Sequence, residues 1–144
     1  MKDKLKLLFL CTGNSCRSQM AEGFANHLKG DLVEAYSAGI ETHGLNPNAV
    51  KVMQELGIDI STQQSKLIGV LKNLEFDYVV TVCDSAHENC PFYPAKVRII
   101  HHRFSDPPKM AARRKKESEK LECYRIVRDE IKKYILELPR NLNV

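Results

Sequence analysis

The stretch Leu5-Lys6-Leu7-Leu8-Phe9-Leu10-Cys11-Thr12-Gly13-Asn14-Ser15-Cys16-Arg17-Ser18 decides the fold, because an apolar run leads directly into a loop and then into a helical pattern. Residues 5–10 are typical of a buried strand, which places Cys11 at its carboxyl end, where open α/β sheets bind ligands. A loop that enters a helix N-terminus binds tetrahedral anions, because unpaired N–H groups and the helix dipole both favour negative charge. We therefore expect an oxyanion loop made of Thr12, Gly13, Asn14, Ser15, Cys16, Arg17 and Ser18.

Cys11 is the candidate nucleophile of this loop. The guanidinium of Arg17 can bond two oxygens of a phosphate-like group at once. The same positive field favours Cys11 as a thiolate, and Ser18 is close enough in sequence to donate a hydroxyl hydrogen bond to it. Gly13 and Asn14 stand where a tight loop needs positive φ. The Cys-x5-Arg spacing is weak evidence by itself, and the alternative is a buried structural cysteine beside a surface arginine.

Length and composition fit one domain spanning residues 1–144. The chain is 43% hydrophobic, which is typical of a globular protein with a real core. We expect no signal peptide, because the first apolar run is short and contains Lys6, and no stretch approaches the roughly 20 apolar residues of a membrane span. A cytoplasmic protein without a membrane partner is the expectation. Five cysteines in such a chain favour nucleophilic, redox or metal chemistry over a disulfide framework.

The net charge of +4 is partly concentrated in Arg113-Arg114-Lys115-Lys116. Such a cluster could attract an acidic partner or nucleic acid. Glu117, Glu119 and Glu122 follow at once, and no aromatic residues for base stacking are interleaved. We therefore interpret the cluster as the solvated first turn of the last helix, and we expect no nucleic-acid partner.

The hydrophobic pattern predicts four strands alternating with helices, hence a single doubly wound α/β domain with a central four-stranded parallel sheet flanked by helices, flavodoxin-like in outline. The predicted elements are strands over 5–10, 32–38, 76–82 and 97–101, helices over about 20–30, 46–56, 65–73 and 114–138, and a rigid turn over 104–108.

Cys83 follows its strand as Cys11 follows the first one. In a parallel sheet both thiols emerge at the same edge, and Cys90 lies a short polar segment further on. Three thiols at one edge suggest a relay, in which one sulfur forms a covalent bond, a second displaces it as a disulfide, and a third moves that disulfide outward. The alternatives are a buried strand-end cysteine for Cys83 and an inconsequential loop thiol for Cys90.

Zinc is a second interpretation of the same region. Its candidate ligands are Cys83, His87, Cys90, His101 and His102. Structural zinc prefers close pairs such as Cys-x2-Cys, and none occurs here, so we expect no metal site. His101 and His102 are expected to end a strand as satisfied polar groups.

Asp106 follows the fourth predicted strand and precedes Pro107, so its carboxylate should face the oxyanion loop. A protonated carboxylic acid there can give a proton to a leaving oxygen. The alternative is an ordinary turn aspartate. Cys123, near the edge of the apolar face of the last helix, is expected to have no role.

Five stretches carry a resemblance to a known family: Cys11-Thr12-Gly13-Asn14-Ser15-Cys16-Arg17-Ser18-Gln19-Met20-Ala21-Glu22, Tyr36-Ser37-Ala38-Gly39-Ile40-Glu41-Thr42-His43-Gly44, Val79 to Cys83, Cys90-Pro91 and Val127-Arg128-Asp129-Glu130-Ile131. In these stretches the chain resembles the thioredoxin-coupled arsenate reductases, which share a fold with the low-molecular-weight protein tyrosine phosphatases. The loop and Asp106-Pro107 are common to both groups, whereas the pair of Cys83 and Cys90 matches the reductases. Such a phosphatase usually carries aromatic residues after its Asp-Pro, where Pro108 and Lys109 stand here.

The resemblance implies a mechanism without a cofactor. Arsenate binds in the loop, held by Arg17 and the loop amides, and phosphate or sulfate would be its analogues. Cys11 attacks arsenic and water leaves, with Asp106 as the acid. Cys83 then attacks the Cys11 sulfur and arsenite departs. Cys90 next attacks Cys83, which gives a Cys83–Cys90 disulfide for thioredoxin to reduce.

The sequence departs from that family at a cation site. Some members bind potassium beside the loop with an asparagine, a glutamate, a serine and an aspartate. Asn14, Glu22 and Ser37 match these positions, but Lys66 stands in place of the aspartate. Because its ammonium could take the place of the cation, we expect no potassium dependence.

Two other functions stay open. The first is a tyrosine phosphatase or phosphomonoesterase that uses Cys11, Arg17 and Asp106 and leaves Cys83 and Cys90 idle. The second is a thiol redox sensor or binding module, in which the loop holds an anion without chemistry.

Overall fold

A computed structural model describes residues 4–71, 73–82 and 98–142 of the chain. Its elements are, in order, β1 (Leu5–Cys11), α1 (Arg17–Leu28), β2 (Val33–Gly39), α2 (Pro47–Gln54), the short 3-10 helix η1 (Ile68–Leu71), β3 (Tyr78–Thr81), β4 (Arg98–His101), α4 (Pro107–Ala111), α5 (Glu117–Leu136) and the 3-10 helix η2 (Arg140–Leu142). Among these residues, no helix is both long and apolar enough to cross a membrane.

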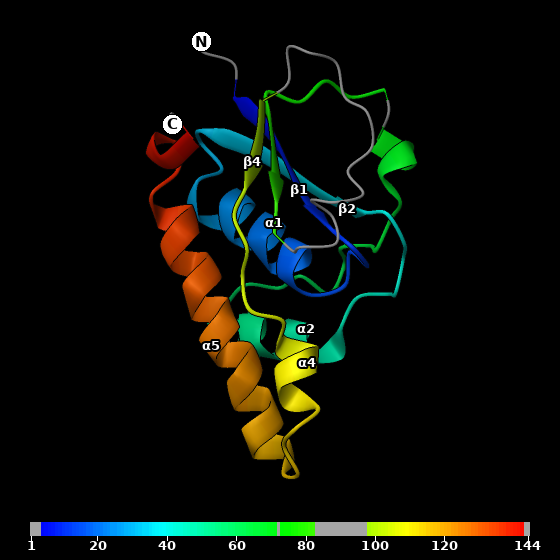
Figure 1. Cartoon of the computed structure of the whole chain (residues 1–144). Coiled ribbons are helices and arrows are strands. Elements are labelled where there is room, and N and C mark those ends of the chain that lie inside the picture. Colours follow the sequence, from blue (N-terminus) through cyan, green and yellow to red (C-terminus); the bar gives the residue numbers. More distant parts are fainter. Residues whose placement is uncertain (1–3, 72, 83–97, 143–144) are drawn as a thin grey trace.

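The four strands form one parallel sheet in the order β2-β1-β3-β4 (Figure 1). β1 pairs with β2 on one side and with β3 on the other, so it lies inside the sheet. Its residues 7–10 are completely buried, as the uninterrupted apolar run predicts for a strand covered on both faces. Cys11 pairs with Gly39 at the carboxyl end of β2, which places the thiol at the edge where ligands bind. The predicted parallel α/β architecture is confirmed.

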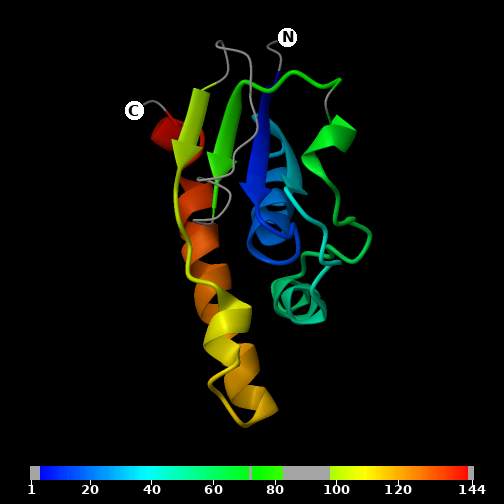
Figure 2. The ribbon, with the colours of Figure 1, turned by 45° about the vertical axis from the view of Figure 1, so that its right-hand side comes forward.

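Helices α1 and α5 lie side by side on one face of the sheet (Figure 2). From α1, Met20 and Phe24 are fully buried, and from α5, Val127, Ile131 and Ile135 are fully buried. These side chains recur every three to four residues, so each helix presents one apolar stripe to the sheet. The packing fixes the start of α1, and therefore the loop in front of it.

Two predicted elements are wrong. Of the helix expected over 65–73, the described residues form only the four-residue η1, in which no residue is fully buried. Ile68 and Leu71 pack against the core but stay partly exposed, so packing stabilises only a short turn. The turn expected over 104–108 contains the start of α4, because Pro107 stands at the first helical position, where a missing N–H costs nothing.

The basic cluster at residues 113–116 is also placed differently from our expectation. It lies in the connection between α4 and α5, since α5 begins at Glu117 and Lys116 is its N-cap. Acidic residues are favoured in the first turn of a helix and basic residues are disfavoured there, because the N-terminal end of the helix dipole is positive. Glu117 and Glu119 occupy that first turn.

Candidate active site

The oxyanion loop is held from outside through its carbonyl oxygens. The hydrogen bonds are Glu41 N–H to Thr12 O at 2.8 Å, His43 N–H to Gly13 O at 3.0 Å, Gln19 Nε2 to Asn14 O at 3.0 Å, and Asn46 N–H to Ser15 O at 3.0 Å. In a trans peptide the C=O and the N–H point in opposite directions. Four consecutive carbonyls that face outward therefore turn the N–H groups of the next residues inward, which is the arrangement of an anion-binding nest.

Asn14 has a left-handed backbone conformation within the loop. Its φ is +47°, and its side chain is fully buried. The amide of Asn14 donates to Ser18 Oγ at 2.9 Å, and its Oδ1 accepts from Lys66 N–H at 2.8 Å and from Gln19 Nε2 at 3.2 Å. Asparagine tolerates the left-handed region better than other side chains, and these bonds fix it there. The expected positive φ is confirmed at this residue.

Gly13 is not in the left-handed region, so that expectation is wrong for it. Steric crowding explains the glycine instead, because a Cβ at position 13 would lie 2.4 Å from Nδ1 of His43. Gly39 is limited in the same way, since a Cβ would lie 2.8 Å from Thr12 O and 2.9 Å from Asn14 N. Both glycines let neighbouring segments approach the loop closely.

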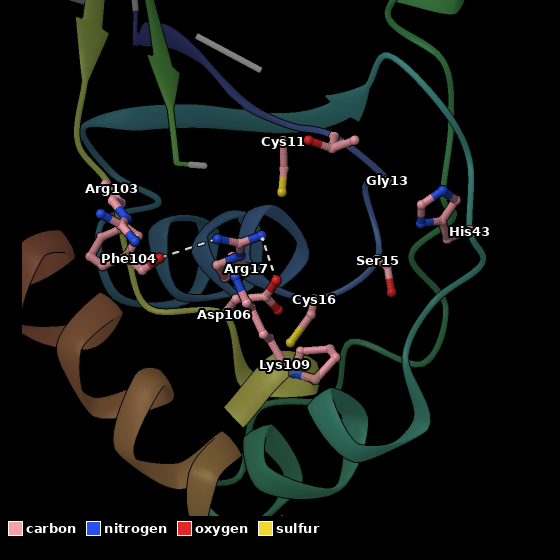
Figure 3. A pocket seen from close by; sticks show the side chains of 12 residues that line it. Cys11, Gly13, Ser15, Cys16, Arg17, His43, Arg103, Phe104, Asp106 and Lys109 are labelled. Atoms are coloured by element: carbon pink, nitrogen blue, oxygen red, sulfur yellow. Dashed lines mark hydrogen bonds and ion pairs between the residues drawn. The ribbon is translucent and has the colours of Figure 1, made fainter. Parts of the chain in front are cut away.

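The guanidinium of Arg17 lies inside the site and is held by two oxygens. Its Nη1 donates to Phe104 O at 3.2 Å, and its Nη2 lies 3.7 Å from Oδ2 of Asp106 (Figure 3). The Arg17 side chain is only 14% exposed, whereas that of Asp106 is 39% exposed. The structure thus brings together the predicted anion-binding arginine and the predicted acid, which are 89 positions apart in the sequence.

A cavity of about 420 Å³ opens over the loop. It is lined by Cys11, Thr12, Gly13, Ser15, Cys16, Arg17, His43, Arg103, Phe104, Asp106, Pro108 and Lys109. Figure 3 shows the Cys11 sulfur projecting into this space toward the guanidinium of Arg17. The predicted nucleophile, arginine and acid therefore share one cavity.

Cys16 lines the same cavity but differs in its electrostatics. Burial raises the pKa of its thiol to about 12, although the neighbouring Arg17 acts in the opposite direction. The sulfur of Cys16 therefore stays protonated at neutral pH and packs at the start of α1, where it is 5% exposed. Between the two loop cysteines, Cys11 is the better placed nucleophile.

A small polar cluster lies beside the loop at the residues that match the cation site. Ser37 Oγ donates to Oε1 of Glu22 at 2.6 Å, and Lys66 Nζ lies 3.9 Å from the same oxygen. Burial raises the pKa of Glu22, and the Ser37 hydroxyl and the Lys66 ammonium only partly offset that effect. The ammonium donates to Gln64 O at 3.1 Å, and it is the backbone N–H of Lys66 that bonds Asn14. The cluster thus holds a cationic side chain near the carboxylate.

Asn46 links the loop to two helices. Its N–H donates to Ser15 O, its Oδ1 caps α2 by accepting from Asn48 N–H at 2.8 Å, and its Nδ2 donates to the hydroxyl of Tyr124 at 3.1 Å. The Asn-Pro pair predicts a helix start from the sequence. The contact with the loop has no sequence signal, because its donor is a backbone N–H.

Replacing Asn46 by alanine is expected to lower the free energy of unfolding by about 1–2 kcal/mol, because the cap of α2 is lost. The backbone N–H still reaches Ser15, so the anion affinity should fall less than about three-fold. Denaturant unfolding and phosphate titration measure the two effects. Asn46→Asp is the matched control, since it keeps the capping oxygen and should stay within about 0.5 kcal/mol of the original chain. If Asn46→Ala and Asn46→Asp lowered the free energy of unfolding equally, the capping role would be contradicted.

Several predicted residues lie outside the described part of the chain. Cys83 and Cys90 are among them, as is His87 of the zinc interpretation. Within residues 4–71, 73–82 and 98–142, no three His, Cys, Asp or Glu side chains are grouped so that they could hold a metal ion. His101 Nδ1 is hydrogen-bonded to Thr81 Oγ1 at 2.6 Å, as expected for a satisfied polar group. Cys123 is buried in α5, where its thiol contacts Glu119 O.

Three basic side chains of the cavity wall were not predicted. They are His43 in the connection between β2 and α2, Arg103 in the connection between β4 and α4, and Lys109 in α4. All three are distant in sequence from the loop. The ring of His43 is hydrogen-bonded to the carboxylate of Glu41 at 2.7 Å. Only the position of Lys109, just after the Asp-Pro pair, offers a signal in the sequence, because residues that follow a strand end tend to line the site.

Comparisons with known proteins agree with this geometry. A family model described as low molecular weight phosphotyrosine protein phosphatase matches residues 6–143. Curated relatives include an arsenate reductase of Shouchella clausii, 55% identical over 87% of this chain and 88% of the relative, and an arsenate reductase of Bacillus subtilis, 52% identical over 91% of each.

Solved structures give the same result. An arsenate reductase described in a phosphate binding state superimposes with a TM-score of 0.72 at 31% identity, over 96% of this chain and 99% of the other. A low molecular weight protein tyrosine phosphatase from T. tengcongensis superimposes with a TM-score of 0.74 at 28% identity, over the same shares. By its sequence and by its fold, the chain belongs to the low molecular weight phosphotyrosine protein phosphatase family.

Proposed function

We propose that this protein reduces arsenate to arsenite through the three thiols Cys11, Cys83 and Cys90, with thioredoxin as the final reductant. The observation that carries the proposal is the placement of Cys11 and Arg17 in one anion-binding cavity, in a chain whose relatives at 52–55% identity are named arsenate reductases. An arsenate ion has the size and charge of the phosphate that such nests bind.

In the first step, the Cys11 thiolate attacks arsenic and a sulfur–arsenic bond forms while an arsenic–oxygen bond breaks. Asp106 lines the same cavity, so once its carboxyl is protonated it can supply the proton with which the oxygen leaves as water. Arg17 and the inward N–H groups stabilise the negative charge of the oxyanion and of the thiolate. All groups that this step needs lie in the described cavity.

In the second step, the Cys83 thiolate attacks the Cys11 sulfur. The electron pair of the sulfur–arsenic bond leaves with arsenic, which is thereby reduced by two electrons to arsenite, and a Cys11–Cys83 disulfide remains. Cys90 then attacks Cys83, which releases Cys11 as a thiol and moves the oxidation to a Cys83–Cys90 disulfide. Thioredoxin reduces that disulfide and restores the enzyme.

A Cys83→Ser variant tests the relay. We expect multiple-turnover arsenate reduction with thioredoxin to fall below about one thousandth of the original rate, because the adduct on Cys11 has no resolving thiol. Cys123→Ser is the matched control, since the buried Cys123 thiol contacts the backbone oxygen of Glu119 within α5 and a serine can keep that bond. Sustained turnover of Cys83→Ser would show that the relay is wrong.

The second candidate is a phosphatase that uses the same cavity. Its support is the tyrosine phosphatase neighbour at a TM-score of 0.74 and the description of the family model. A phosphatase needs Cys11, Arg17 and Asp106 but not Cys83, so a weak hydrolysis of aryl phosphates should survive in Cys83→Ser. A chain that hydrolyses phosphate esters rapidly and forms no arsenite in a single turnover would favour this candidate.

A redox sensor is distinguished by its disulfides. Mass mapping after exposure to arsenate should detect a Cys83–Cys90 bond if the relay operates. A sensor would form disulfides with peroxide and none with arsenate, and that result would count against the reductase.

We also expect no activation by potassium. The ammonium of Lys66 lies 3.9 Å from the Glu22 carboxylate, so a positive charge is already supplied at the matching position. Activity in potassium chloride should equal activity in sodium chloride of the same ionic strength to within about 1.5-fold, because screening is the same in both. A marked rise with potassium would contradict this role of Lys66.

A further inference from the structure

A second cavity adjoins the active site. Its volume is about 500 Å³, and it is lined by Arg103, Ser105, Asp106, Lys109, Met110, Arg113 and Arg114. Arg103, Asp106 and Lys109 line the active-site cavity as well. The two cavities therefore share a wall, and the second one extends from this wall to the connection between α4 and α5. We call it the basic trough.

The charge of the basic trough is strongly positive. In the part of its lining that the structure describes, four side chains are cationic and Asp106 carries the one carboxylate. That carboxylate lies 3.7 Å from the guanidinium of Arg17, so part of its charge is already balanced from the active-site side. A concave surface of one charge sign focuses the field and raises the local concentration of counter-ions, which increases their association rate.

Backbone hydrogen bonds fix the point at which Arg113 and Arg114 leave α4. Arg113 N–H donates to Met110 O at 3.3 Å and Arg114 N–H donates to Ala111 O at 3.0 Å, so both arginines follow α4 in a hydrogen-bonded turn. Both residues are exposed, and both line the basic trough. Their charge is thus directed at solvent next to the catalytic cavity.

We propose that the basic trough captures small, multiply charged oxyanions and delivers them to Cys11. This inference rests on the proposed function, because it assigns the trough to the substrate of that same site. The lining favours a small ion over a macromolecule. Among the described residues along it, Met110 is the one large apolar side chain. Protein interfaces instead centre on aromatic and apolar anchors, and single-stranded nucleic acids need aromatic side chains for stacking.

The double variant Arg113→Gln/Arg114→Gln tests the capture. We expect kcat/KM for arsenate to fall about three- to ten-fold at an ionic strength of about 0.02 M, while kcat at saturating arsenate is unchanged. At about 0.5 M salt the double variant and the original chain should have the same kcat/KM, since charges are then screened within a few ångströms. Lys4→Gln/Lys133→Gln is the matched control, because it removes the same charge from the position just before β1 and from the last turn of α5.

A second readout does not depend on arsenate reduction. Iodoacetate is an anion and iodoacetamide is neutral, and both alkylate the Cys11 thiolate. The rate of alkylation by iodoacetate divided by the rate with iodoacetamide, measured on the peptide that contains Cys11, reports the electrostatic potential at the mouth of the cavity. We expect this ratio to fall about three-fold or more in the arginine double variant and to stay unchanged in the control.

Each outcome decides one question. A lower alkylation ratio with a salt-sensitive loss of kcat/KM supports capture by the trough. An unchanged ratio and an unchanged kcat/KM at low salt would overturn it, even if the enzyme reduces arsenate normally. A lower ratio in a chain that reduces no arsenate would retain the capture of anions and reject the proposed function instead. A loss of kcat/KM that persists at about 0.5 M salt would also overturn it, because screening must abolish a long-range effect.

Discussion

Replacement of Cys11 by serine is expected to abolish the formation of arsenite. A hydroxyl is not ionised at neutral pH. In the proposed relay arsenic keeps the electron pair of the sulfur–arsenic bond when the Cys11 sulfur enters a disulfide, and a serine oxygen can form no disulfide. Loss of a nucleophile that acts together with its neighbours costs at least about a thousand-fold, and here the product needs the sulfur itself. Arsenite formed in a single turnover, measured per mole of protein, should therefore fall to the background of the assay.

Anion binding separates this effect from misfolding. Serine is close to cysteine in size, and the carbonyls of the oxyanion loop are held by three backbone N–H groups and the Gln19 amide, none of which the substitution touches. Phosphate should therefore bind Cys11→Ser within about three-fold of its affinity for the original chain, as measured by calorimetry. Cys16→Ser is the control inside the same loop, because the buried Cys16 thiol stays protonated and does not act as a nucleophile. Its turnover should stay within about ten-fold of that of the original chain. Arsenite production by Cys11→Ser would remove Cys11 from the reaction.

Replacement of Arg17 by lysine should lower kcat/KM for arsenate about a hundred- to a thousand-fold, although the charge is kept. The guanidinium of Arg17 already bonds Phe104 O and lies beside Asp106. Only its planar fork can keep these contacts and still present N–H groups to two oxygens of the anion. A lysine ammonium has to leave one set of partners to reach the other, so orientation and charge stabilisation are both lost.

Steady-state kinetics and phosphate titration measure the loss. The matched control is Arg125→Lys, which alters an arginine on the surface of α5 that pairs with Glu55 at 2.8 Å. Surface pairs of this kind contribute little, so the control should change kcat/KM less than about two-fold. If Arg17→Lys retained more than about one tenth of the activity, a point charge would suffice and bidentate binding would be rejected.

The centre of the fold and of the site was predictable because it depends on local patterns. The apolar run of residues 5–10 places Cys11 at the end of a central strand, and the structure confirms this position. The polar and glycine residues that follow indicate a loop with unusual backbone angles, and Asn14 has the expected positive φ. Asp106 faces Arg17 because two parallel strands end at the same edge of the sheet.

The support of the loop could not be predicted in the same way. Glu41, His43 and Asn46 hold it through backbone N–H groups, which every residue but proline carries, so no side-chain pattern marks them. The extent of the short helices was also missed, since Ile68 and Leu71 of η1 are only partly buried and α4 begins where a proline pair suggested only a turn. Both features depend on tertiary contacts that the sequence does not display.

The backbone origin of that support has a consequence for the evolution and design of this site. Because residues 41 and 43 hold the loop through their main-chain N–H groups, their side chains are free to change without disturbing the anion-binding geometry. His43 stands on the wall of the cavity, so such changes would alter what the rim accepts while the chemistry beneath stays the same. One scaffold can in this way diversify its choice of substrate at little risk to its catalytic core.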